Sequence, residues 1–154
     1  MFKLVSNIGI RIAIVVVIGV GAFVFRDRLS GAAADLGVGE CFDQPAANLE
    51  RIEDVQHHPC VESHDAEVFH VFDHPAAADG AYPSDEAWAE IVFPRCDGPF
   101  SAYTGQSATV AGELTYSMYT PTEDGWSEGD REVICFLYRT DGTAMTTSSR
   151  VATP

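Results

Sequence analysis

The sequence predicts an α+β domain that follows a single N-terminal transmembrane helix. Three observations predict this class: one apolar run near the N-terminus, four scattered cysteines beyond it, and several short strand-like segments with one helix signal among them. Strands and helices that are not in regular alternation are typical of α+β folds. We therefore expect a small disulfide-stapled domain of mostly antiparallel strands with one or two helices.

Charge divides the chain into the same two parts. The 154 residues include 9 basic and 23 acidic ones, which gives a formal net charge of −14. The first 28 residues hold four basic and one acidic residue, whereas the rest hold five basic and 22 acidic residues, a net charge of −17. Nucleic acid is excluded as a partner, because phosphate contacts need clustered Lys and Arg. The hydrophobic content of 46% is too high for a disordered acidic tail, so the body is expected to fold.

The apolar run spans residues 8–25 and contains a single charge, Arg11. A helix of this length would reach about 27 Å, close to the roughly 30 Å hydrocarbon thickness of a bilayer. Because Arg11 lies near one end, its side chain can extend to the interface. We expect residues 1–7 to form a cytoplasmic N-terminus and residues 8–25 to be the transmembrane helix through which the protein associates with the membrane.

Three alternatives compete with an uncleaved anchor. A cleaved signal peptide would use the alanines at 32–34, but the charges at 26–28 directly follow the apolar run and leave that site far downstream. A lipoprotein is disfavoured because the first cysteine, Cys41, is distant from the run. A buried core helix with no polar face would need a larger protein around it. We favour the anchor.

The cysteines indicate the compartment. All four follow the apolar run, and none is in CxxC spacing: Cys41, Cys60, Cys96 and Cys135. Zinc sites usually contain close pairs, whereas scattered cysteines after an export-competent segment favour two disulfides. Four cysteines permit three pairings; we favour Cys41–Cys60 with Cys96–Cys135 because each closes a modest loop. The alternative is four free thiols in a cytoplasmic domain.

Disulfides form in oxidising compartments, so the domain is predicted to be extracytoplasmic. The predicted location is the cell membrane, with a single pass and an extracytoplasmic C-terminal domain; secretion after signal cleavage is the alternative. Residues 26–37 contain small residues without periodicity and are predicted to be a tether. The domain then covers 38–150, and 151–154 form a tail.

Strands are predicted first at 39–42, 52–56 and 67–72. The last of these alternates with the period of a strand, with Val68, His70 and Phe72 on one face and Glu67, Phe69 and Val71 on the other. Both faces are largely apolar, which favours a central strand covered on each side.

A helix is predicted to begin after Ser84, which can cap it, and to end at Pro94. A second short helix is predicted over 96–103. Two further strands, at 113–119 and 132–138, are joined by segments rich in turn-forming residues.

All five histidines, His57, His58, His64, His70 and His74, lie within one short window. Imidazoles beside carboxylates suggest a transition-metal site or a pH sensor. The spacing matches no recognised ligand set, so we predict no metal site and keep His57, His58, His70 and His74 as weak candidates only. No cofactor is predicted.

No motif of a known enzyme class is present, and His64 has no nucleophile at a diagnostic spacing. A cysteine hydrolase built on Cys60 would contradict the disulfides. The carboxylates around Trp126 are interpreted as a solvated acidic rim, and Trp126 itself as part of the core. The protein is predicted not to be an enzyme.

Several blocks together resemble a known family. They are Gly39–Asp43, Val55–Cys60, His64–Val68, Tyr82–Pro83, Cys96, Pro121–Thr122, Trp126–Arg131 and Cys135. This pattern, over roughly 36–150, resembles the actinobacterial septum-formation domain. One departure is Ser63, where the family pattern has a proline.

The resemblance implies a membrane-anchored or secreted extracytoplasmic domain of an actinobacterium, associated with septation and without established enzymatic activity. We predict a non-enzymatic interaction module that binds a protein or cell-envelope partner, with a metal- or pH-responsive sensor in the histidine window as the alternative. The predicted motif residues, structural or binding, are His64, Asp65, Glu67, Trp126, Gly129 and Arg131.

Overall fold

The structure is a computed structural model, and it describes residues 30–45, 54–77, 79–108, 110 and 112–152. Within these ranges no helix combines the length and the apolar character needed to cross a membrane. The predicted cytoplasmic N-terminus and transmembrane helix, residues 1–7 and 8–25, lie outside the described residues.

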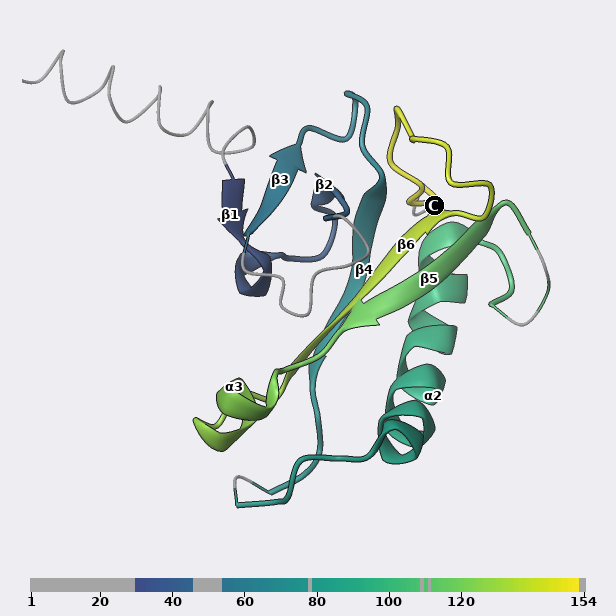
Figure 1. The fold of residues 1–154 in the computed structure, drawn as a ribbon. Helices are drawn as coiled ribbons and strands as arrows, with labels where there is room; N and C mark the ends of the chain where they lie inside the picture. Colours follow the sequence, from purple (N-terminus) through teal and green to yellow (C-terminus); the bar gives the residue numbers. More distant parts are fainter. Residues whose placement is uncertain (1–29, 46–53, 78, 109, 111, 153–154) are drawn as a thin grey trace, which may run out of the picture.

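The described residues form a six-stranded sheet in which neighbouring strands are antiparallel (Figure 1). The spatial order is β1-β3-β2-β4-β6-β5. The strands are β1 (Ser30–Ala32), β2 (Cys41–Asp43), β3 (Asp54–His58), β4 (Ala66–Asp73), β5 (Leu114–Tyr119) and β6 (Glu132–Arg139). This confirms the predicted antiparallel sheet, and the strands predicted at 67–72, 113–119 and 132–138 are all present.

Strand β4 lies inside the sheet, between β2 and β6, and apolar clusters cover both of its faces. The prediction of a central strand is therefore confirmed. His70 and Phe72 share a face as predicted and stack on each other, but Val68 does not share it, because the register with β6 shifts between Val68 and His70. Phe69 is the extra residue of this β-bulge, and a bulge reverses the alternation beyond it. Val68 and Phe72 consequently join opposite clusters.

The segment predicted as the end of a tether belongs to the folded unit. Strand β1 pairs with β3, and a single 3-10 turn, η2 (Ala33–Asp35), follows it. Ala33 and Leu36 are buried beside Phe42 in a group of apolar side chains called here the second apolar cluster, whose other buried members are Val55, Ala66, Val68, Ile134 and Phe136. Burial of these apolar side chains stabilises the segment against the sheet, although its sequence shows no periodicity.

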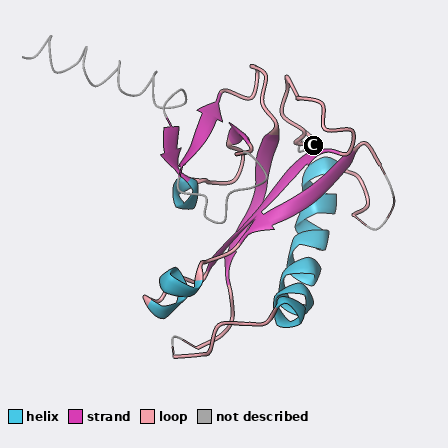
Figure 2. Ribbon diagram, in the orientation of Figure 1, coloured by secondary structure: helices cyan, strands magenta, loops and turns pink. Residues whose placement is uncertain are grey.

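One helix, α2 (Asp85–Thr104), covers a face of the sheet and contacts β4 and β6 (Figure 2). Ser84 caps it as predicted: its Oγ accepts a hydrogen bond from the Ala87 amide at 3.3 Å. The predicted end at Pro94, with a separate helix at 96–103, is wrong. Both Pro94 and Pro99 lie inside one continuous helix.

Packing explains why α2 passes through its prolines. Its buried side chains recur about once per turn and form the first apolar cluster with β4 and β6: Trp88, Val92, Cys96, Phe100 and Tyr103. Pro94 is exposed, so the carbonyl that lacks an amide partner because of its ring can bond water. Gly105, at φ 70°, ends the helix in the left-handed conformation.

The segment between β5 and β6 contains a short helix, α3 (Glu123–Ser127), where the sequence predicted turns. Thr122 caps it, with its Oγ1 accepting from the Gly125 amide at 3.1 Å. A helix this short contains the same residue types as a turn, and for this reason the sequence predicted turns here.

All four cysteines are bridged, and the favoured pairing is confirmed. Cys96–Cys135 joins α2 to β6 inside the first apolar cluster. Cys41–Cys60 joins β2 to the turn that follows β3. The two bridges thus tie separate parts of the domain, one across the layers and one at the end of the sheet.

Candidate functional site

The six predicted motif residues fall into two groups at opposite ends of the β4–β6 pair. His64, Asp65 and Glu67 lie at the start of β4, where Ala66 pairs with Tyr138. The other three, Trp126, Gly129 and Arg131, precede β6, which begins where Asp73 pairs with Glu132. At about 3.3 Å per residue the two ends are roughly 20 Å apart. The structure therefore does not unite the motif residues in one site.

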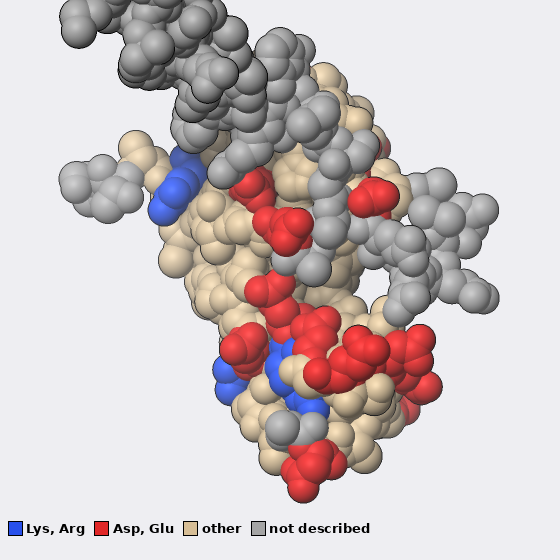
Figure 3. All heavy atoms as spheres, turned by 90° about the vertical axis from the view of Figure 1, so that its left-hand side faces the viewer, with Lys and Arg blue, Asp and Glu red and all other residues tan. Residues whose placement is uncertain are grey.

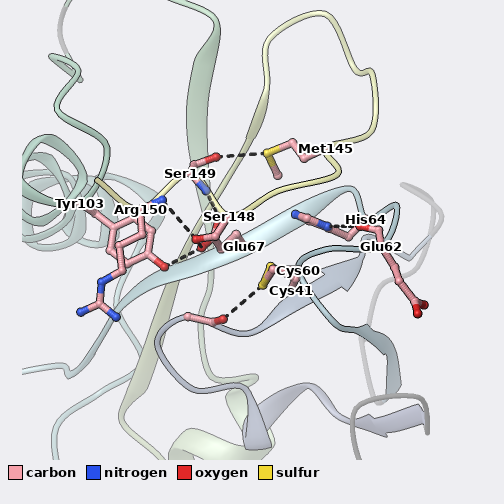
Figure 4. The surroundings of a disulfide bond; sticks show 11 residues. Cys41, Cys60, Glu62, His64, Glu67, Tyr103, Met145, Ser148, Ser149 and Arg150 are labelled. Atoms are coloured by element: carbon pink, nitrogen blue, oxygen red, sulfur yellow. Dashed lines mark hydrogen bonds between the residues drawn. A yellow bond between two sulfur atoms is a disulfide. The ribbon is translucent and has the colours of Figure 1, made fainter. Parts of the chain in front are cut away.

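Two members of the first group, His64 and Glu67, lie near the Cys41–Cys60 disulfide (Figure 4). Cys41 is 1% exposed, whereas Cys60 is partly exposed in the turn after β3. The bridge forms part of the wall of a shallow surface pocket of about 220 Å³. The lining residues are Gly39, Glu40, Cys41, His57, His58, Pro59 and Cys60.

Glu67 is a fully buried carboxylate at this end of the sheet. It accepts hydrogen bonds from the Tyr103 hydroxyl at 2.6 Å, the Ser149 amide at 2.7 Å and the Ser148 hydroxyl. A buried carboxylate without partners would be costly, and these three donors offset that cost. Glu67 thereby ties helix α2 and the C-terminal segment to β4.

The same contact acts on the tyrosine. Burial, followed by the hydrogen bond to Glu67 and its charge, raises the pKa of Tyr103 far above its usual value of 10. The phenol is thus held in its protonated, donating form. Tyr103, Ser148 and Ser149 were not predicted, because they lie 36 to 82 residues from Glu67 and no short-range pattern links them.

His64 is fully buried beside this carboxylate. Its backbone pairs with Met145 in both directions, at 3.0 and 2.8 Å. The Nδ1 atom lies 2.8 Å from the carbonyl oxygen of Glu62. Since a carbonyl only accepts, Nδ1 donates in this contact, and in the tautomer that carries its proton on Nδ1 the other nitrogen, Nε2, is an acceptor. Among the described residues, Nε2 has no hydrogen-bond partner.

An imidazole nitrogen of His64, the Cys41 Sγ atom and a Glu67 carboxylate oxygen all lie within 4.8 Å of one another. Figure 4 shows the imidazole extending from its Glu62 contact toward Glu67 and the disulfide. This is the one group of potential metal ligands that the described part of the chain brings together. A sulfur in a disulfide is not the thiolate that a metal needs, so the group as it stands is not a metal centre.

The weak metal candidates do not belong to this group. His57 and His58 are neighbours on β3, so their side chains point to opposite faces of the sheet. His58 contacts Asp43 at 2.9 Å, and His70 stacks on Phe72. The predicted histidine window is thus spread over separate surroundings, and the sensor hypothesis stays a prediction.

Asp65 contributes through its backbone, whose amide bonds the Phe42 carbonyl at 3.1 Å. This contact holds the chain beside β2 just before β4 begins. Among the described residues, its side chain is not part of a group that could hold a metal ion.

The second group is an aromatic cluster at the other end of the sheet. The rings of His74, Tyr82, Trp88 and Trp126 meet edge to face, with centroids 4.8 to 5.8 Å apart. Trp126 is 3% exposed and its Nε1 donates to the Gly80 carbonyl at 2.7 Å. It is therefore part of the core, as predicted from sequence.

Arg131 closes the outer side of this cluster. Its guanidinium lies 3.7 Å from the centroid of the Trp126 ring and donates to the Trp126 carbonyl at 2.8 Å. Gly129 has a φ of 102°, a left-handed conformation that glycine adopts without strain. Trp126, Gly129 and Arg131 therefore each have a structural role in this part of the domain.

Acidic side chains gather on the face that Figure 3 shows. Glu132 is close enough to three other acids to feel their charges: Asp130 two residues before it, and Asp73 and Asp35 from other segments. The pKa of Glu132 is raised by partial burial and then by the other three charges. The sequence predicted an acidic rim near Trp126. It did not predict that Asp35 and Asp73 would lie near Glu132, because only the high overall content of acidic residues pointed to them.

These features define a class: a small extended antiparallel sheet covered by one helix, held by two disulfides and by a buried carboxylate clamp. The model of the septum formation family matches residues 38–153, and the chain belongs to this family. Searches of curated proteins and of solved structures found no match.

Proposed function

We propose that the protein is a non-enzymatic, membrane-anchored interaction module that acts outside the cytoplasm during cell division. The single observation that carries this proposal is the septum formation family match, which covers residues 38–153 and indicates a role related to cell division. The proposed partner is another protein or a component of the cell envelope.

Two features support the proposed location. The apolar run at 8–25 is long enough to span a bilayer, and the domain beyond it is closed by two disulfides. Disulfides persist in oxidising compartments outside the cytoplasm. A reporter enzyme that is active only outside the cytoplasm, fused after Pro154, is expected to be active. Activity of a cytoplasm-specific reporter at the same position would contradict the proposal.

Retention at the membrane separates the anchor from the secreted alternative. The full-length chain is expected in the membrane fraction with residues 8–25 intact, as read by N-terminal peptide mass spectrometry. A mature chain that begins after 34 and is released to the medium would instead establish cleavage.

Binding, rather than catalysis, is proposed because two of the predicted motif residues, Glu67 and Arg131, are held in contacts within the domain. Glu67 already has three donors, and the Arg131 guanidinium is engaged by Trp126. These contacts stabilise the fold. A partner would therefore bind to exposed side chains on the surface of the domain.

Site-specific photo-cross-linking in living cells tests the interaction. A photoreactive residue is placed at Asp130 on the acidic face, with matched probes at Val61 and Val110, which are 81% and 65% exposed. We expect one position to give a defined product that contains a division or envelope component, and depletion of the protein to disturb septum placement. Equal products at all three positions, or unchanged septa after depletion, would contradict the proposal.

A further inference from the structure

We propose that Cys41–Cys60 is a thiol-exchange site: a protein dithiol reduces this bridge reversibly, while Cys96–Cys135 stays closed. The substrate class is a dithiol or disulfide carried by another protein. This inference rests on the surroundings of the two bridges and is independent of the proposed function.

The bridges differ first in access. Cys96 and Cys135 are both 0% exposed and lie within the first apolar cluster. Cys60 is partly exposed and lines the pocket at the end of the sheet, while its partner Cys41 is buried. Exchange requires a thiolate to reach a sulfur atom directly. An incoming thiolate can therefore reach Cys60 in the folded protein, whereas Cys96–Cys135 requires opening of the core.

The bridges differ also in their polar neighbours. The His64 imidazole lies within 4.8 Å of the Cys41 sulfur, and its buried Nε2 has no partner among the described residues. A disulfide sulfur has no proton to donate, so the oxidised state leaves this nitrogen unsatisfied. A buried polar atom without a partner destabilises the state that contains it.

Reduction supplies the missing donor. Once the bridge opens, Cys41 carries an S–H group that can donate to Nε2 after a small movement of the thiol. The reduced state gains a hydrogen bond that the oxidised state lacks, which makes this bridge easier to reduce.

The exchange proceeds in two steps through a mixed disulfide. A partner thiol loses its proton to water, and its thiolate attacks the Cys60 sulfur to form a mixed disulfide. The bond to Cys41 breaks, its electron pair stays on the Cys41 sulfur, and that sulfur takes a proton from water. The second thiol of the partner then loses its proton to water and attacks the partner sulfur of the mixed disulfide. The bond to Cys60 breaks, its electron pair stays on the Cys60 sulfur, and that sulfur takes a proton from water, so the partner leaves as a disulfide and this protein as a dithiol. The partner supplies both electrons.

Redox titration of the full-length chain tests the proposal. The protein, purified without reductant, is equilibrated in dithiothreitol buffers of graded potential, trapped by alkylation and read by peptide mass spectrometry. We expect Cys41 and Cys60 to become reduced while Cys96–Cys135 is intact and the near-UV circular dichroism is native. Reduction of both bridges together, only on global unfolding, would overturn the proposal.

Two variants test the roles of the residues. In Cys41→Ser, Cys60 is expected to form a mixed disulfide with oxidised glutathione at least about tenfold faster than Cys41 does in Cys60→Ser. In His64→Gln, the equilibrium constant for reduction is expected to fall about tenfold, a shift of about 30 mV to more negative potential. His70→Gln, a matched change on β4 beside Cys135, should leave the Cys41–Cys60 potential unchanged.

Each variant has an opposite outcome. Equal reactivity of Cys41 and Cys60 would contradict the claim that an incoming thiolate attacks Cys60. An unchanged potential in a folded His64→Gln protein would show that the imidazole does not favour the reduced state. Either result would overturn the proposed site.

Discussion

Tyr103 and Glu67 lie 36 residues apart in the chain and share a 2.6 Å hydrogen bond between helix α2 and strand β4. The same carboxylate holds the C-terminal segment through Ser148 and Ser149. Three parts of the chain that are remote in sequence thus meet at one buried acid. This clamp is the polar counterpart of the Cys96–Cys135 bridge, which joins the same helix to β6.

Tyr103→Phe removes one donor to the buried carboxylate. The free energy of unfolding is expected to decrease by about 1–3 kcal/mol, because Glu67 loses a partner that water cannot readily replace. Urea denaturation measures this. Tyr82→Phe is the matched control: its hydroxyl donates to the Pro121 carbonyl at 3.0 Å and its side chain is 37% exposed, so a smaller loss is expected. Equal losses would contradict the clamp.

Pro94→Ala is expected to stabilise the protein, by about 1 kcal/mol or more. Proline inside a helix lacks the amide donor and is unfavourable relative to alanine, and the exposed position of Pro94 makes its contribution to packing small. Thermal unfolding followed by circular dichroism gives the change in Tm. A lower Tm would show that the proline ring supports the present course of α2.

Stability is expected to decrease in mild acid because of His74. Burial, and then the positive charges of Arg131 and Arg95, lower the pKa of His74 below its ordinary value of 6.5. The unfolded chain therefore binds the proton more readily, and the free energy of unfolding falls as the pH decreases from about 6.5 toward the lower pKa of the folded state. The pKa of His70 is lowered in the same direction, by burial and then by Arg95.

Urea midpoints measured between about pH 7.5 and 5 check this dependence. His74→Phe, which keeps an aromatic ring against Trp88 and Trp126, should flatten the curve. A stability that rises on acidification, or an unchanged slope in the variant, would be inconsistent with a neutral buried imidazole.

Arg131→Ala should destabilise the aromatic cluster by about 1–3 kcal/mol, because it removes both the stacking on Trp126 and a charged donor to the Trp126 carbonyl. Arg131→Lys keeps the charge but not the planar fork, so it should restore the loss only in part. Tryptophan fluorescence during unfolding reports the change. Full restoration by lysine would mean that charge alone matters at this position.

Much of the fold is visible in the sequence because local patterns determine it. The apolar content of 133–137 predicts the buried strand β6, and Ser84 predicts the start of α2. The disulfide pairing that was favoured among three possibilities is the observed one, with sequence separations of 19 and 39 residues. In each case the signal lies within a short stretch or in a simple spacing.

The features that sequence did not predict depend on tertiary contacts. The bulge at Phe69 arises from pairing with β6, and α2 continues through Pro94 because its buried face packs on the sheet. Residues 33–36 fold because the second apolar cluster accepts Ala33 and Leu36. For the candidate site, sequence identified His64 and Glu67 but not the donors to Glu67, because those donors come from α2 and the C-terminal segment.

Thiol trapping in intact cells tests the central claim most directly. Cells are treated with a membrane-impermeant alkylating agent, and the full-length protein is then recovered and mapped without reduction. We predict a membrane-associated chain in which Cys96–Cys135 is closed in every molecule and only Cys41 or Cys60 is ever labelled. A soluble cytosolic chain with all four cysteines reduced and protected from the agent would contradict the location and the architecture together.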